Sequence, residues 1–219
     1  GPLELRIAIA NHLAKFRNLV VNPEQIIVGA GTEYLYTLLV QLLGKNCRFA
    51  VENPGYKKTS AIFEANGAFC FPIEMDNSGL LPQKLNELKI DAVHVSPAHH
   101  FPTGIVMPIR RRQELLNWAY NQNTFIIEDD YDSEFRFDGR PLDTLFSMDN
   151  NERVIYLNTF TKSISPSLRI SYMVLPENLV QEFRNKLGFY SCTVSSIEQL
   201  TLASFISGGW FEKHLIRMK

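Results

Sequence analysis

The sequence has little cysteine, no excess of charge of either sign and no long apolar run. Its three cysteines, Cys47, Cys70 and Cys192, are far apart and form no CxxC pair, which favours reduced thiols in a cytoplasmic protein. Lys and Arg number 22 against 23 Asp and Glu, so the chain lacks the basic excess of a sequence-independent nucleic-acid binder. The longest nearly apolar stretch, residues 34–43, is about half of a membrane span, so no membrane association is expected.

What the sequence does contain is an ordinary globular composition, with 45% apolar and 21% charged residues. Short, solidly apolar segments alternate with segments of helical periodicity, which predicts a three-layer α/β/α fold around a mostly parallel sheet. Strands are expected at 26–28, 48–51, 68–73, 92–95, 124–127, 154–157 and 170–174. Helices are expected from residue 3 to 16 and at 32–43, 57–66, 82–88, 108–120, 177–187 and 196–205, and again over the last residues. In such folds, ligands bind beyond the carboxyl ends of the strands.

The first two strands are followed by a glycine-rich turn and by an aromatic residue. The turn, 29–33, opens a helix with Thr32 as its expected N-cap, and the free N–H groups of a helix start attract anions. Taken alone, the turn is a weak signal and favours an ordinary N-cap over an anion site. After the second strand comes Tyr56, which could stack on a planar ligand or simply pack on the surface.

Two later strand ends carry histidines and acids. His99 and His100 lie in a Pro- and Gly-rich loop, but no HxxxH, CxxC or HExxH spacing occurs, so no metal site is expected. Five acids lie within residues 128–134. They could form a solvated loop or bind a divalent cation. Because they follow a buried strand, one of them should face the ligand edge, where a carboxylate could keep a cationic ring nitrogen charged.

The segment 158–169 follows the next strand with several hydroxyl groups, Lys162 and Arg169. Hydroxyls and a guanidinium suit a phosphate group, and a lysine in a partly apolar site can attack a carbonyl. A solvated basic loop is the alternative for this segment alone. Together, however, the strand ends offer what a phosphorylated pyridine aldehyde requires, and pyridoxal 5'-phosphate is that molecule.

The sequence also resembles the fold-type I pyridoxal-phosphate aminotransferases. It is most similar to the aminotransferase-like domain of MocR-type (GabR-like) transcription regulators of the GntR family. The segments that carry the resemblance are 5–10, 52–56, 99–104, 128–135 and 159–172, in the family's order, and the strings EDDYDSEFR and NTFTKSISPSLRISY are the most specific. The implied fold is the large domain of an aspartate-aminotransferase-like transferase.

The resemblance implies roles for individual residues. Lys162 would be the catalytic lysine that forms the aldimine with the cofactor, Asp129 would pair with the pyridine nitrogen, Tyr131 would bond the phenolic oxygen, and Tyr56 would stack on the ring. His99 would line the site. The phosphate would be held by Thr32, Thr159, Thr161 and Arg169 together with the backbone amides of Thr32 and Glu33, and Gly31 is a further cofactor-binding residue. Many family members carry Gln in place of Glu33, and a carboxylate beside a phosphate is unfavourable unless it points away.

The resemblance also has implications for the domain organisation and the partners of the whole protein. Residues 1–219 are interpreted as a pyridoxal-phosphate-binding large domain, in which 208–219 begin a C-terminal small domain that lies outside the sequence. This piece alone is expected to turn substrate over poorly or not at all. The implied partners are an amino acid, a keto acid and a second subunit in a homodimer, with DNA bound only through an N-terminal winged-helix domain outside this chain. Two alternatives remain: a stand-alone amino-acid transaminase, and a plain α/β domain without cofactor.

Overall fold

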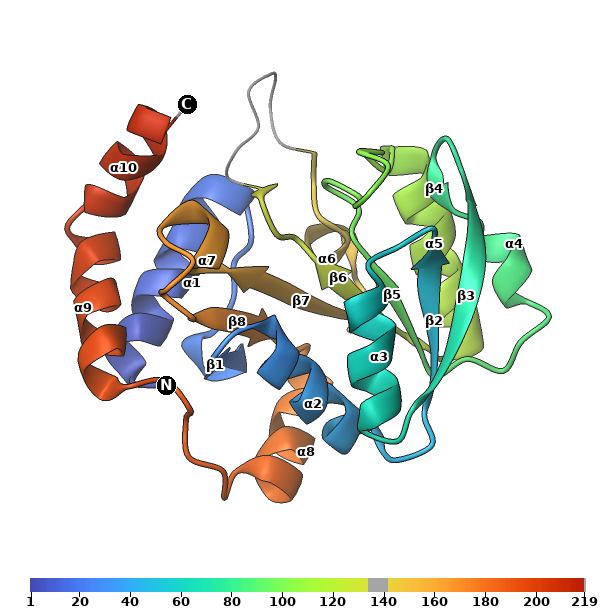
Figure 1. Cartoon of the computed structure of the whole chain (residues 1–219), viewed down its shortest axis with the longest axis horizontal. Coiled ribbons are helices and arrows are strands. Elements are labelled where there is room, and N and C mark those ends of the chain that lie inside the picture. The colour runs from blue at the N-terminus through green and yellow to red at the C-terminus, as the bar shows by residue number, and fades with distance from the viewer. Residues whose placement is uncertain (134–141, 219) are drawn as a thin grey trace.

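The computed structural model describes residues 1–133 and 142–218 and has one mixed β-sheet with helices on both faces (Figure 1). The eight strands lie in the order β1-β8-β7-β6-β5-β2-β3-β4. Their bounds are β1 Ile26–Gly29, β2 Arg48–Asn53, β3 Phe69–Asp76, β4 Gly79–Leu80, β5 Ala92–Val95, β6 Phe125–Asp129, β7 Val154–Thr159 and β8 Ser171–Val174. The predicted three-layer, mostly parallel α/β architecture is therefore confirmed.

The helices follow the predicted positions closely. Their bounds are α1 Leu3–Arg17, α2 Thr32–Leu43, α3 Lys57–Ala65, α4 Pro82–Leu85, α5 Ile109–Gln122, α6 Leu145–Met148, α7 Phe160–Ser163, α8 Glu177–Leu187, α9 Ser196–Ser207 and α10 Trp210–Met218, with a 3-10 turn η1 at Pro23–Gln25. The short elements β4, α6 and α7 were not predicted, because a few residues are too short to show a period. None of the described helices has the length and apolar character that a bilayer crossing requires.

Strand direction is where the sheet departs from a uniform parallel pattern. The strands β7, β6, β5, β2 and β3 are parallel, whereas β8 runs antiparallel to both of its neighbours, β1 and β7. Only residues 160–170 connect β7 to β8. A parallel crossover needs about a dozen residues or more, usually with a helix long enough to cross the sheet, so this short connection reverses the chain.

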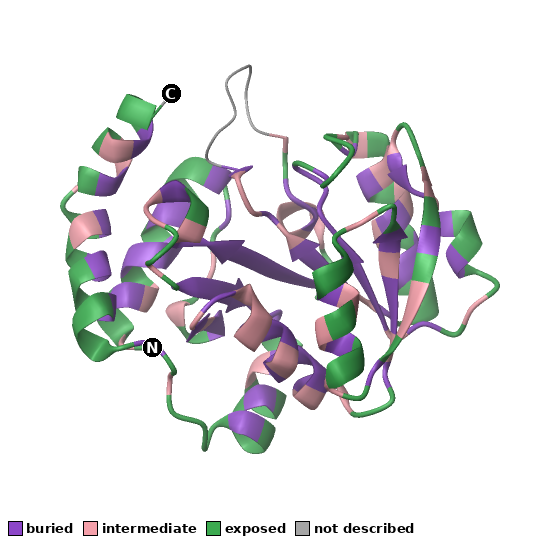
Figure 2. Ribbon diagram, viewed as in Figure 1, coloured by how far each residue is buried: buried purple, intermediate pink, exposed green. Residues whose placement is uncertain are grey.

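The apolar side chains of the central strands alternate between two helical layers. On β7, Tyr156 packs into a core cluster with α1, α9 and α10, whereas Leu157 packs into a cluster with α2 and α8 on the opposite face. All six residues of β7 are buried, and the buried sheet between partly exposed helices is visible in Figure 2. This double coverage explains why the strands are solidly apolar in sequence.

The last helix, α10, packs against α9 and buries Phe211 completely beside α1. The structure thus shows how residues 210–218 contact the sheet domain. Whether 208–219 belong to a further domain stays a prediction.

Candidate functional site

A single cavity of about 460 Å³ gathers the residues that the sequence singled out. Such a volume lies in the ordinary range for small-molecule sites. Every predicted site residue lines it: Gly31, Thr32, Glu33, Tyr56, His99, Asp129, Tyr131, Thr159, Thr161, Lys162 and Arg169. They come from β6, β7, α2, α7 and the loops around them, because the carboxyl ends of neighbouring parallel strands meet at one edge of the sheet.

One end of the cavity lies at the start of α2. Gly31 is the N-cap of this helix, with φ of 90°, and its cap has no side-chain hydrogen bond. The prediction of Thr32 as N-cap is therefore wrong. The N-cap lies one residue earlier, at Gly31, and its positive φ is a conformation that glycine adopts most readily. A Cβ atom at Gly31 would lie only 2.7 Å from Nη2 of Arg169. Uncapped N–H groups and a closely approaching guanidinium together make this end a suitable anion site.

Hydroxyl groups continue the same wall. Thr159 caps the short helix α7 by accepting the N–H of Thr161 at 3.2 Å, and its Oγ1 also accepts a hydrogen bond of 2.8 Å from the buried Ser171. Thr161 donates from Oγ1 to the carbonyl of Leu168 at 3.1 Å. These bonds fix the backbone on both sides of Phe160, whose buried ring anchors α7 to the core.

Lys162 projects from α7 into the cavity. Its amine makes no hydrogen bond or ion pair with the described part of the chain, and it lies near the carboxylate of Asp132, whose pKa is raised mainly by burial. A free amine on a well-anchored backbone is what a nucleophilic lysine needs.

Asp129 is held by a relay of two buried side chains. The hydroxyl of Tyr36 donates to Oδ2 of Asp129 at 2.6 Å and lies 2.9 Å from Nε2 of His94. Because the phenol has one proton and gives it to the carboxylate, Nε2 of His94 must be the donor to Tyr36. Burial and the neighbouring Asp129 raise the pKa of Tyr36 well above its usual value, which keeps the phenol protonated.

Two polar atoms beside this relay have no partner in the described part of the chain. Oδ1 of Asp129 and the hydroxyl of Tyr131 are both buried and make no hydrogen bond within the described residues. Burial, first of all, raises the pKa of Tyr131. Unsatisfied buried polar atoms are rare in proteins, and two of them on one cavity wall indicate a ligand that completes them. An acceptor carboxylate and a phenol donor suit a protonated ring nitrogen and a phenolate oxygen.

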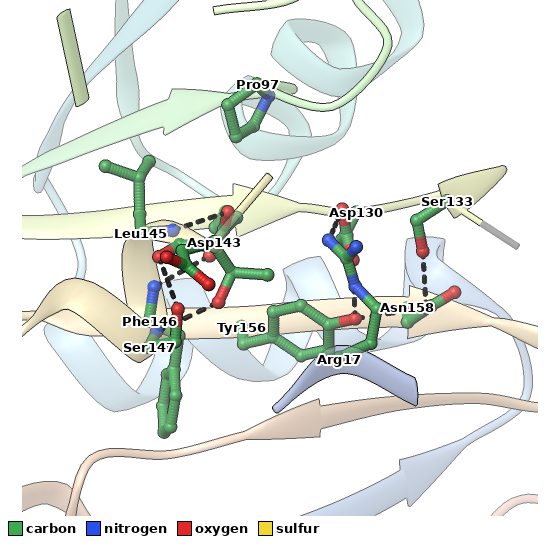
Figure 3. Close-up of polar contacts among 12 residues, drawn as sticks. Arg17, Pro97, Asp130, Ser133, Asp143, Leu145, Phe146, Ser147, Tyr156 and Asn158 are labelled. Carbon is green, nitrogen blue, oxygen red and sulfur yellow. Dashed lines mark hydrogen bonds and ion pairs between the residues drawn. The ribbon is translucent and has the colours of Figure 1, made fainter. Parts of the chain in front are cut away.

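The acids on either side of Asp129 do not line the cavity and bind other parts of the chain. Glu128 accepts the N–H groups of Leu145 and Phe146, both at 2.9 Å, and Asp130 lies 2.7 Å from Arg17 and accepts the hydroxyl of Tyr156 at 2.7 Å. Figure 3 shows the contacts of Asp130 with Arg17 and Tyr156. Burial raises the pKa of Glu128 to about 7. Of the acids at 128–134, Asp129 and Asp132 line the cavity, and Glu134 lies outside the described residues.

Aromatic rings border the opening. Tyr56 is 58% exposed and packs edge to face against Phe101, with 5.9 Å between the ring centroids. The ring centroids of His99 and Tyr131 are 6.2 Å apart. His100 is not among the lining residues, and its Nδ1 forms a hydrogen bond of 2.7 Å with Oγ1 of Thr103.

Sequence reasoning missed several lining residues: Tyr36, Lys58, Thr59, Ile62, Phe101 and Asp132. One signal was present for Tyr36, which lies one helical turn after Thr32 and so shares its face of α2. Lys58 and Thr59 lie in the first turn of α3, immediately after Tyr56, and could have been included with it.

Residues 1–216 match the family model described as aminotransferase class I and II. The chain belongs to this family. Among curated proteins it is 45% identical over 219 residues to the HTH-type transcriptional regulator YdeL of Bacillus subtilis, covering all of this chain and 47% of that protein. It is 36% identical to the pyridoxine biosynthesis regulator PdxR of Corynebacterium glutamicum, again over all of this chain and 48% of the relative.

A solved structure is also similar. The kynurenine aminotransferase of Pyrococcus horikoshii in complex with PMP superposes with a TM-score of 0.88 at 28% identity, over 99% of this chain and 56% of that one. The resemblance to the aminotransferase-like domain of MocR-type regulators is thus confirmed, and the regulators are the more similar in sequence. The chain spans about half the length of the curated relatives it matches.

Proposed function

We propose that this chain binds pyridoxal 5'-phosphate and reacts with an amino acid, as the effector-binding or catalytic domain of a MocR-type transcription regulator. One observation supports the proposal most directly: the amine of Lys162 shares a cavity with the buried Oδ1 of Asp129 and the buried hydroxyl of Tyr131, and none of these atoms has a hydrogen-bond partner among the described residues. The relatives support it, since an aminotransferase of the same fold was solved with PMP.

The residues present fit this cofactor. Pyridoxal phosphate supplies an aldehyde and an electron-withdrawing ring. Nζ of Lys162 would bind the aldehyde carbon and later move a proton, and Oδ1 of Asp129 would hold the proton of the ring nitrogen. The hydroxyl of Tyr131 would donate to the phenolic oxygen, and the ring of Tyr56 would cover one face. The phosphate would be bound by the first N–H groups of α2 with Thr159, Thr161 and Arg169.

The whole protein is proposed to extend beyond this chain. The relatives are about twice as long and are HTH-type regulators, which supports a DNA-binding domain outside the present sequence. We further propose a cytoplasmic homodimer, an amino acid and its keto acid as small-molecule partners, and residues 208–219 as the beginning of a small domain.

Reductive trapping tests the proposal. The chain is mixed with pyridoxal phosphate, reduced with borohydride, digested and mapped by mass spectrometry. We expect one cofactor adduct, on Lys162 and not on Lys58, the other cavity lysine. The variant Lys162→Ala should lose the adduct, whereas Lys89→Ala, at an exposed position outside the cavity, should keep it. No adduct, or an adduct that persists in Lys162→Ala, would reject the assignment.

A further inference from the structure

The anion-binding end of the cavity contains a carboxylate between two cations. Oε1 of Glu33 lies 2.5 Å from Nζ of Lys58 and 3.5 Å from Nη2 of Arg169. Glu33 is in the first turn of α2 and Lys58 in the first turn of α3, and these helices pack side by side (Figure 1). All three side chains line the cavity and are about half exposed, between 43% and 51%.

The side chain of Arg169 lies close to the backbone of Gly31. Its guanidinium lies where a side chain at Gly31 would begin, with Nη2 only 2.7 Å from that point. The cation therefore lies beside the start of α2, where the N–H groups have no side-chain cap. Lys58 approaches the same carboxylate oxygen from α3, so one anion at this place can contact both cations.

The net charge of Lys58, Arg169 and Glu33 is too small to neutralise a phosphate group. The hydrogen bond from Lys58 lowers the pKa of Glu33, so this carboxylate is ionised at neutral pH. Two cations and one carboxylate give a net charge of +1, whereas a phosphate monoester carries about −1.5 to −2. Without the Glu33 charge, the same cations would match the phosphate.

We propose that Lys58 is a second phosphate-binding cation beside Arg169, and that Glu33 competes with the cofactor's phosphate for both. The inference rests on the proposed function. It adds that Glu33 makes the affinity for the cofactor lower than Lys58 and Arg169 alone would give. Glu33 is thereby a residue that sets cofactor affinity. A mere structural link between α2 and α3 would affect stability and not phosphate affinity.

The variant Glu33→Gln separates these roles. The dissociation constants of pyridoxal phosphate and of pyridoxal, which lacks the phosphate, are measured by absorbance titration. For half-exposed charges we expect Glu33→Gln to tighten pyridoxal phosphate about two- to fivefold and to leave pyridoxal unchanged. The matched control is Glu182→Gln, since Glu182 and Lys186 form a pair of 2.6 Å with similar exposure on α8, outside the cavity. It should change neither constant.

The variant Lys58→Gln tests the other half and should weaken pyridoxal phosphate by a similar factor, again without effect on pyridoxal. The inference is overturned if Glu33→Gln leaves pyridoxal phosphate affinity unchanged or lowers it, if Lys58→Gln has no effect, or if both ligands shift equally. If the parent chain binds neither ligand, the proposed function itself fails. Binding by the parent chain with no response to Glu33→Gln rejects only the competition.

Discussion

The hydroxyl of Tyr36 donates a 2.6 Å hydrogen bond to Oδ2 of Asp129, and this bond determines which oxygen of the carboxylate remains for a ligand. With Oδ2 occupied, Oδ1 is the buried, unpartnered atom on the cavity wall. Tyr36 is itself almost fully buried and receives a hydrogen bond from His94. The orientation of Asp129 is therefore fixed before any ligand arrives.

We expect Tyr36→Phe to lower the free energy of unfolding by about 1–3 kcal/mol, because a buried carboxylate oxygen and Nε2 of His94 lose their partner. The affinity for pyridoxal phosphate should fall as well, since Asp129 can rotate. Urea unfolding and an absorbance titration measure the two effects. Tyr120→Phe, at an exposed position on α5, is the control and should change neither. An unchanged stability in Tyr36→Phe would contradict the relay.

Much of the fold was predictable because each central strand is a short apolar run with a polar strand end. The same rule located Asp129, Lys162 and Arg169, since residues that directly follow parallel strands meet at one edge. The direction of β8 was not predictable from its apolar residues, which look the same in either orientation. It depends on the short connection 160–170, whose one-turn helix α7 shows no period in sequence.

The residues that position Asp129 could not be recognised from the sequence either. His94 lies inside a buried strand, and Tyr36 on the buried face of α2, so both look like core residues. Their polar atoms gain a function only when β5, α2 and β6 come together in space. Likewise, the acidic run 128–134 does not show which carboxylates turn inward, because that depends on where Arg17 and α6 lie.

Removal of either partner from the buried pair of Arg17 and Asp130 is expected to destabilise the fold strongly. Their side chains are 6% and 0% exposed, and the contact joins the end of α1 to the residue after β6. Among the described residues, Arg17→Met would leave the buried carboxylate of Asp130 with only the hydroxyl of Tyr156, and Asp130→Asn would leave a buried guanidinium. Each single change should lower the free energy of unfolding by about 3–5 kcal/mol, and the double variant by clearly less than the sum.

Urea denaturation of the four chains of this double-mutant cycle measures the coupling. The control is Lys15→Met on the same helix, since Lys15 pairs with Glu212 at 2.5 Å but is 63% exposed. An exposed pair contributes at most about 1 kcal/mol. Additive costs in the cycle would show that Arg17 and Asp130 stabilise the fold independently of each other.

The protonation of His12 is expected to make the free energy of unfolding depend on pH. Its ring is 6% exposed and lies between Phe16 and Phe211, at 4.8 and 5.1 Å. Burial lowers its pKa from 6.5 to about 4, with Lys15 and Arg17 adding to the effect and Glu212 opposing it. The native state therefore binds this proton less readily than the unfolded chain does. The stability associated with the neutral ring is complete above pH 6.5 and is lost as the pH falls towards 4.

Between pH 7 and pH 4.5 the loss from His12 should be about 2 kcal/mol, since one pKa unit corresponds to about 1.4 kcal/mol. His12→Gln has no titrating ring, so its unfolding free energy should fall by about that much less over the same interval. Carboxylates that titrate in this range contribute to both chains and cancel in the comparison. Urea unfolding at the two pH values gives the difference, and an equal loss in both chains would show that the neutral, buried ring of His12 is not the cause.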